Sequence, residues 1–285
     1  MKLSNRFLKS LAAVSVLALA GVGNPGPAHA SSPSPEPSSG SSERASDSSG
    51  GGPGSSEGAP DSSKGAPGSR EGVPRGLERF YKQKLTWSEC KGKDRAGMQC
   101  ANVKVPLDYK KPGGKAITVA MLKVPAKSGK PMGTLFLNPG GPGSSGTGFA
   151  SAASWIFSLE IRDKYDVVGF DPRGVGESAA VECVDDATLE KYVDADYDVS
   201  TVAGRAAQKR DAKKIAAQCM KHSGRLLRHV GTESAARDMD VMRSLVGDKK
   251  LNYFGFSYGT SLGGMYADLF PKKVGRMVLD SAVDT

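Results

Sequence analysis

The sequence predicts an α/β fold, in which helices cover both faces of a mainly parallel sheet. Short apolar runs alternate along the chain with stretches of helical periodicity, and this alternation is typical of parallel strands joined by crossover helices. Residues 134–138 and 165–170 each form a compact run suited to a buried strand. A third apolar run begins at Leu251, leads into Gly255-Phe-Ser257-Tyr-Gly259, and is followed at once by a helical pattern.

The folded part is expected to begin near Gly76 with a short helix and two antiparallel strands. The helix is indicated by four apolar residues, Leu77, Phe80, Tyr81 and Leu85. Residues 101–107 and 115–124 have strand patterns, and a Lys-Pro-Gly-Gly turn separates them. A turn of this kind between two strand patterns favours an antiparallel pair.

Residues 179–231 are mostly polar and helical, and we interpret them as an excursion between two elements of the sheet. After this excursion, Thr232 is the expected N-cap of a helix that Gly247 ends. The apolar face of that helix holds four residues, Ala235, Met239, Met242 and Val246.

The last predicted elements are a helix after Ser257 and a strand over residues 274–280. Pro271 ends the helix, whose apolar face holds Leu262, Met265, Tyr266 and Leu269. The apolar run from Met277 to Leu279 indicates that the strand is buried, and an unpaired apolar edge is unfavourable. We interpret three large apolar residues as packing residues rather than substrate contacts: Trp155, Phe157 and Met265.

The first 75 residues predict a leader and a linker. Residues 1–30 combine basic residues, an apolar stretch and Ala28-His-Ala30, which is the pattern of a secretory signal peptide with its cleavage site. Residues 31–75 hold 15 Ser, 9 Gly and 7 Pro and can bury almost nothing, so they predict a disordered linker. We therefore expect residues 76–285 to be the folded part of a secreted, extracellular protein.

The charge of the chain is basic but scattered. The formal net charge is +9, and removal of three basic leader residues leaves 9 − 3 = +6. The lysine pairs have no aromatic residues between them, so we expect a solvated basic surface and no nucleic-acid partner. No stretch after the leader is long and apolar enough to span a bilayer, and no cysteine follows the cleavage site to accept lipid, so we expect no membrane anchor after signal cleavage.

Four cysteines in an exported chain indicate disulfides, and four cysteines allow three connectivities. We favour the local pairs Cys90–Cys100 and Cys183–Cys219. The histidines near Cys219 have neither the spacing of a zinc site nor a fourth ligand. We expect no metal and no cofactor.

Ser257 has the sequence context of a nucleophile elbow, a tight strand-to-helix turn that holds a serine hydroxyl outward. The positions two before and two after such a serine lie close together and require small residues, which Gly255 and Gly259 are. In a chain with 36 glycines the pattern alone is weak, and it also occurs at residues 54–58. That second copy has no apolar run beside it, so we predict that Ser257 is the catalytic nucleophile.

A nucleophilic serine needs hydrogen-bond donors for the oxyanion that forms on the substrate carbonyl. We expect one donor to be the backbone N–H of Tyr258, and the other to lie in the loop after residues 134–138. This loop reads Asn138-Pro-Gly-Gly-Pro-Gly. Proline has no N–H, so the second donor is expected to be Gly140 or Gly141.

The same loop also matches a dinucleotide fingerprint, Gly-x-Gly-x-x-Gly, from Gly141 to Gly146, with Asp166 further along the chain. We regard this interpretation as the weaker one. Pro142 removes an N–H from a loop that would have to bind pyrophosphate, and the interpretation leaves Ser257 unexplained.

Three motifs occur in order: Asn138-Pro-Gly-Gly-Pro-Gly143, Phe170-Asp-Pro-Arg-Gly-Val-Gly-Glu-Ser178 and Gly255-Phe-Ser-Tyr-Gly259. They resemble motifs of the secreted tripeptidyl aminopeptidases, in the proline-iminopeptidase branch of the α/β-hydrolase superfamily. The opening Leu-Thr-Trp-Ser-Glu-Cys is similar to theirs as well, and the resemblance runs from about Gly76 to the last residue. Proline iminopeptidases usually have His where Asn138 stands, so the tripeptidyl group is the more similar one.

The resemblance implies an α/β-hydrolase fold and a serine exopeptidase that releases short peptides from the free N-termini of peptide substrates. It implies an acyl-enzyme on Ser257 and an oxyanion hole formed by Tyr258 and the Gly140/Gly141 loop. Asp171 and Arg173 would support a turn at the catalytic edge of the sheet. An esterase or lipase on the same scaffold and a non-catalytic binding module of that fold stay open as alternatives.

The chain has no histidine after Ser257, although the triad order in this fold is Ser, then Asp or Glu, then His. We interpret His222 and His229, which precede Ser257 in a polar helical region, as surface residues. Asp280 comes one strand earlier than the triad acid of the family. We therefore expect the acid, the histidine and the last strands beyond Thr285, and a chain that is nearly inactive alone.

Overall fold

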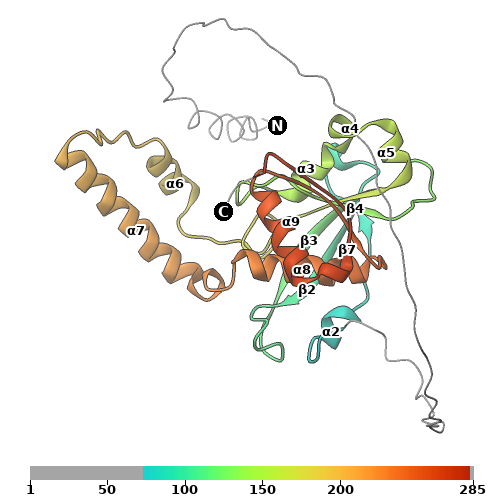
Figure 1. Ribbon diagram of the computed structural model, residues 1–285. Coiled ribbons are helices and arrows are strands. Elements are labelled where there is room, and N and C mark those ends of the chain that lie inside the picture. Colours follow the sequence, from blue (N-terminus) through green and yellow to red (C-terminus); the bar gives the residue numbers. More distant parts are fainter. Residues whose placement is uncertain (1–72, 283–285) are drawn as a thin grey trace, which may run out of the picture. The chain divides into compact units, whose positions relative to one another are not determined.

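In the computed structural model, residues 73–282 are described, and they form a mixed sheet flanked by helices (Figure 1). The order of its seven strands is β1-β2-β3-β5-β4-β6-β7. The predicted leader and nearly all of the predicted linker lie outside the described residues. Among the helices of the described residues, none has both the length and the apolar character needed to cross a membrane.

One half of the sheet is antiparallel. It consists of β1 (Ser88–Glu89), β2 (Gln99–Pro106) and β3 (Ala116–Val124), and β3 also runs antiparallel to β5 (Asp166–Phe170). The predicted opening hairpin is therefore confirmed. The helix before it, α2 (Glu78–Tyr81), is shorter than the sequence pattern indicates.

The other half of the sheet is parallel and holds the edge where the candidate site lies. Here β5 pairs with β4 (Thr134–Asn138), β4 with β6 (Leu251–Phe256), and β6 with β7 (Val274–Asp280). The parallel strands were predicted from their compact apolar runs, and the sheet confirms them. At the end of the described sheet, β7 leaves Val278 50% and Leu279 39% exposed, so the expectation that this strand is buried is wrong for the described residues.

Side chains of the parallel strands alternate between two core clusters, because successive residues of a strand point to opposite faces. Phe136 and Tyr253 belong to one cluster, and their neighbours Leu137 and Phe254 belong to the other. The first cluster packs against α2, α8 (Thr232–Leu245) and α9 (Tyr258–Leu269); the second packs against α3 (Gly146–Ser151) and α4 (Ala153–Ile156). Helices on both faces are therefore confirmed.

A charged cluster lies inside the first face. The carboxylate of Asp240 is fully buried and accepts hydrogen bonds from Tyr81 Oη at 2.6 Å, Lys273 Nζ at 2.7 Å and Arg243 Nε at 2.8 Å. Burial acts to raise the pKa of Asp240, but these donors outweigh it and hold the pKa below its usual value. Asp240 is therefore charged at neutral pH.

Two further expectations, for Thr232 and Trp155, are wrong. Thr232 is the first residue of α8 rather than its N-cap; Gly231 takes the N-cap position, and the Thr232 hydroxyl bonds to the Tyr258 hydroxyl instead. Trp155 is not a packing residue, since it is 91% exposed, whereas Phe157 and Met265 do pack against the core clusters.

The predicted excursion is a helical arm. It contains α6 (Asp186–Val193) and α7 (Val202–Leu227), and neither helix has a buried residue. Figure 1 shows α7 running away from the sheet. The disulfide Cys183–Cys219 joins the segment before α6 to α7, and Cys90–Cys100 closes the loop before β2, so both favoured pairings are confirmed.

Candidate active site

Ser257 lies on the turn between β6 and α9, at the carboxyl edge of the parallel strands. Its backbone has φ 50° and ψ −123°, a conformation that is unfavourable for a residue with a side chain. The Ser257 N–H donates to the Asp280 carbonyl at 3.0 Å, and the Ser257 carbonyl accepts from the Thr260 N–H at 2.8 Å. These bonds hold the turn, and the Ser257 side chain is exposed with no hydrogen-bond partner among the described residues.

Glycines on either side of Ser257 make the turn possible. A Cβ at Gly255 would lie 2.5 Å from the Gly259 carbonyl oxygen, and a Cβ at Gly259 would lie 2.8 Å from the Asn138 carbonyl oxygen. Both distances are too short for a side chain. The elbow therefore closes on itself and also packs against the end of β4.

The loop after β4 packs directly on this elbow. Gly140 has φ 92°, and a Cβ there would lie 2.5 Å from the Phe256 carbonyl oxygen and 3.1 Å from the Ser257 Cβ. The Gly140 N–H donates to Asn138 Oδ1 at 2.9 Å, so it is not available to an oxyanion. Of the two glycines that the sequence nominates as donors, Gly141 is the one whose N–H has no partner among the described residues.

Asp171, at the end of β5, holds the far end of the same loop. Its buried carboxylate accepts hydrogen bonds from Ser145 Oγ at 2.7 Å, from the Thr147 N–H at 2.9 Å and from the Glu177 N–H at 2.8 Å. Ser145 is itself the N-cap of α3. The expected supporting role of Asp171 therefore has a geometric basis, which is to fix the glycine loop between β4 and α3.

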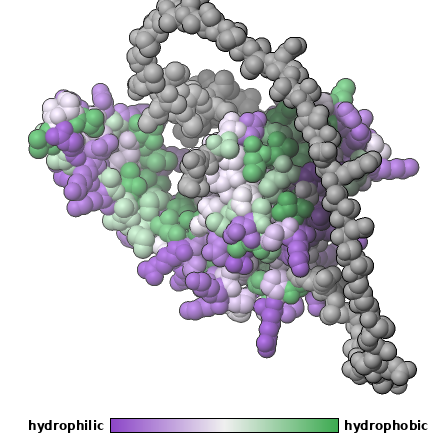
Figure 2. Space-filling model, viewed as in Figure 1, coloured by the Kyte–Doolittle hydropathy of each residue, from purple (hydrophilic) through white to green (hydrophobic). Residues whose placement is uncertain are grey.

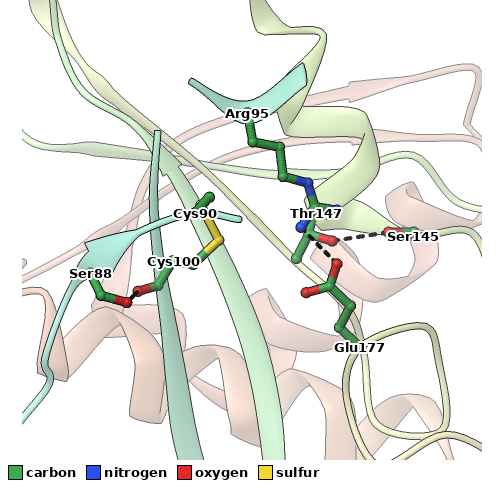
Figure 3. Close-up of a disulfide and its surroundings, with 7 residues drawn as sticks. All are labelled: Ser88, Cys90, Arg95, Cys100, Ser145, Thr147 and Glu177. Carbon is green, nitrogen blue, oxygen red and sulfur yellow. Dashed lines mark hydrogen bonds and ion pairs between the residues drawn. A yellow bond between two sulfur atoms is a disulfide. The ribbon is translucent and has the colours of Figure 1, made fainter. Parts of the chain in front are cut away.

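A second brace reaches this region from the start of the fold. Figure 3 shows Arg95, on the loop closed by the Cys90–Cys100 disulfide, reaching Glu177 near Ser145 and Thr147. The Arg95–Glu177 ion pair is 2.6 Å long and partly exposed. Because Glu177 also donates its N–H to Asp171, the disulfide loop, the β5 turn and the glycine loop are joined by short contacts.

Arg173 holds the root of the helical arm. Its guanidinium forms a two-pronged pair with Asp238 of α8, with Nε–Oδ2 at 2.7 Å and Nη2–Oδ1 at 2.6 Å, and it donates to the His229 carbonyl at 3.0 Å. Arg173 and Asp238 are both buried. The sequence provides no signal for Asp238, because 65 residues separate it from Arg173.

Helix α8, which follows the arm, contacts the residue that follows the serine. Thr232 Oγ1 and Tyr258 Oη share a hydrogen bond of 2.6 Å. The Tyr258 N–H, the other expected oxyanion donor, has no hydrogen-bond partner among the described residues. Thus Ser257, Tyr258 and Gly141 meet at one edge of the sheet, beside the root of the arm.

No base accompanies Ser257 within residues 73–282. His222 is exposed on α7, and His229 takes part through its backbone carbonyl, with Arg173 as donor. The zinc alternative loses a ligand because Cys219 is in a disulfide. The described part of the chain has no group of three or more His, Cys, Asp or Glu side chains suited to a metal ion.

Comparison with known proteins agrees with this architecture. The model of the alpha/beta hydrolase fold family matches residues 133–285. The chain is 44% identical over 194 residues to a tripeptidyl aminopeptidase of Streptomyces coelicolor, an alignment that covers 66% of this chain and 35% of that protein.

Two mycobacterial proteins are also similar. The chain is 38% identical over 210 residues to serine protease Hip1 of Mycobacterium tuberculosis, covering 71% of this chain and 40% of that protein. It is 40% identical over 192 residues to carboxylesterase B of the same organism, covering 65% of this chain and 36% of that protein. The chain therefore spans between 35% and 40% of the length of these relatives.

Proposed function

We propose, from the fact that this chain belongs to the alpha/beta hydrolase fold family, that Ser257 is the acylating nucleophile of a serine peptidase. The observation that carries the proposal is the strained, exposed Ser257 beside two backbone N–H groups, those of Tyr258 and Gly141, that have no hydrogen-bond partner within residues 73–282. The chain has the lineage of the serine hydrolases, as its peptidase relatives indicate.

In the proposed reaction, the Ser257 Oγ attacks the carbonyl carbon of a peptide bond and gives its proton to a base. The carbonyl oxygen becomes an oxyanion, which the N–H groups of Tyr258 and Gly141 stabilise. The C–N bond then breaks, the base returns the proton to the leaving amine, and an acyl group stays on Ser257. Water hydrolyses this ester by the same proton transfers in the second half of the reaction.

The proposed substrates are peptides with a free N-terminus, from which short peptides are released. Two of the similar proteins carry the names tripeptidyl aminopeptidase and serine protease, which supports a peptidase. The similarity to a protein named carboxylesterase B supports esterase activity as the second candidate. We further propose that the protein is secreted, which the two disulfides support because such bonds persist in oxidising compartments.

The base in this scheme is proposed to come from outside the described residues, since none of their histidines contacts Ser257. A serine hydrolase without its histidine loses about a million-fold in turnover. The chain is therefore proposed to act slowly alone, and to need an acid and a histidine supplied by further polypeptide, as the greater length of its relatives suggests.

The test replaces the missing base by free imidazole. The purified chain is treated with a fluorophosphonate probe, with and without imidazole, beside the Ser257→Ala variant. We expect imidazole to accelerate labelling of the chain and to leave the variant unlabelled. Equal labelling of both proteins would contradict the role of Ser257, and rates on peptide amides against short esters then separate peptidase from esterase.

A further inference from the structure

The helix α7 is strongly basic and stands apart from the sheet. Its 26 residues contain one acidic residue, Asp211, and none of the 26 is buried. Figure 2 shows hydrophilic side chains gathered along the outer side of this helix. The basic residues are Arg205, Lys209, Arg210, Lys213, Lys214, Lys221 and Arg225.

Four of these basic residues form one stripe. Arg210, Lys214, Lys221 and Arg225 are spaced at i, i+4, i+11 and i+15, so they fall within about 60° of the helix circumference over about 22 Å. Only Lys214 has an ion pair within the described residues, with Asp211 at 3.1 Å. Like charges at i and i+4 repel each other, and the Lys214–Asp211 pair is the one ion pair that offsets this repulsion in the stripe as the described residues show it.

The acidic segment that precedes α7 does not neutralise the stripe. Residues 182–198 contain seven acidic side chains, Glu182, Asp185, Asp186, Glu190, Asp194, Asp196 and Asp198. Within the described residues, none of them forms an ion pair with α7. This segment contacts α7 instead through the Cys183–Cys219 disulfide and through hydrogen bonds from uncharged groups. One of them runs from the Tyr197 hydroxyl to the Asp211 carboxylate at 2.9 Å.

The stripe ends at the root of the arm, where Arg225 lies seven residues before Thr232. Thr232, five residues after the end of α7 at Leu227, shares its hydrogen bond with Tyr258, the neighbour of Ser257. Arg173 fixes the intervening His229 carbonyl. From this root the stripe runs outward along α7, from Arg225 to Arg210.

We propose that the stripe binds an acidic stretch of a polypeptide substrate whose N-terminal end lies at Ser257, a proposal that rests on the proposed function. An extended chain covers about 3.3 Å per residue, so the stripe spans about seven substrate residues. Nucleic acid fits less well because α7 has no Phe, Tyr or Trp side chain for base stacking. A membrane fits less well because its large exposed apolar residues are only Val202 and Met220.

The test measures binding rather than turnover. A fluorescent peptide with a free N-terminus, a short alanine segment and a glutamate run is titrated with the chain at low ionic strength, and its anisotropy is followed. The stripe variant carries Arg210→Gln, Lys214→Gln, Lys221→Gln and Arg225→Gln. The matched control carries four Lys→Gln changes elsewhere, at Lys110, Lys111, Lys249 and Lys250.

We expect the stripe variant to bind the peptide about tenfold more weakly or worse, since four exposed charge contacts are lost together. The control variant and Ser257→Ala should bind like the unmodified chain, and salt should weaken binding. Thermal unfolding of each variant shows whether it is folded. Since Ser257→Ala is expected to retain binding, the two proposals can fail separately. A failure of Ser257 labelling would contradict the proposed function and would leave the binding result unchanged.

Three results would overturn the proposal. The first is equal weakening in the stripe and control variants, which would mean a general effect of net charge. The second is equal binding of a peptide with glutamine in place of glutamate. The third is tighter, stripe-dependent binding of anionic phospholipid vesicles or double-stranded DNA, which would assign the surface to another partner.

Discussion

Replacing Arg173 with alanine removes the centre of a buried network. The guanidinium pairs with both carboxylate oxygens of Asp238 and donates to the carbonyls of Pro106, Leu107 and His229. After the replacement, Asp238 would keep only the hydrogen bond from Tyr109 Oη, at 2.7 Å. A buried carboxylate would then lack a counter-charge.

The expected loss of stability follows from the burial of this pair. The side chains of Arg173 and Asp238 are 0% and 2% exposed, so water cannot compensate for the missing guanidinium. Removing one partner of such a pair costs about 3–5 kcal/mol. That loss is a large fraction of the roughly 5–15 kcal/mol by which ordinary domains are stable.

Urea unfolding at pH 7 measures this loss, and α8 supplies a matched control. Arg237 pairs with Glu233 on the same helix, but these side chains are 33% and 59% exposed. We expect Arg237→Ala to change the free energy of unfolding by no more than about 0.5 kcal/mol. The double variant of Arg173→Ala with Asp238→Ala should recover part of the single-variant loss, because no unpaired charge remains.

Equal small losses for Arg173→Ala and Arg237→Ala, under about 1 kcal/mol, would contradict a buried Asp238 charge without compensation. A double variant less stable than Arg173→Ala by the full cost of a second buried loss would contradict it as well. Either result would mean that Asp238 finds water or another partner when Arg173 is absent.

Two further predictions concern the glycine loop and the Asp240 cluster. Gly140→Ala should abolish imidazole-dependent labelling and lower the melting temperature more than Gly143→Ala. Both glycines have positive φ, but only at Gly140 would an added Cβ lie 2.5 Å from a backbone atom, the Phe256 carbonyl oxygen. Equal effects of the two substitutions would contradict the packing described. The lowered pKa of Asp240 means that its contribution to stability is present above its unfolded pKa of about 3.9 and is lost as pH falls below that value. Urea unfolding should therefore show a smaller acid-induced loss for Asp240→Asn than for the unmodified chain, and parallel profiles would contradict it.

Local patterns in the chain were sufficient for most of the secondary structure and for the elbow. The strands at 134–138 and around 251 are recognisable because their apolar runs are short and contiguous. The elbow is recognisable because its glycines lie two residues from Ser257 on either side. The disulfides Cys90–Cys100 and Cys183–Cys219 follow from the preference for local pairs. In each case the information lies in neighbouring residues, so a single sequence is enough to find it.

Contacts between distant residues required the folded molecule. The Asn138 side chain accepts the hydrogen bond of the Gly140 N–H, which leaves the Gly141 N–H as the candidate oxyanion donor. This outcome depends on side-chain geometry within the loop. Threonine is a residue type that often serves as an N-cap. In the fold, however, the Thr232 hydroxyl forms its hydrogen bond with the Tyr258 hydroxyl instead. Trp155 has the size of a core residue and yet lies on the surface. Propensity and spacing describe what a residue prefers locally, whereas these outcomes depend on which partners the packed sheet brings within hydrogen-bond distance.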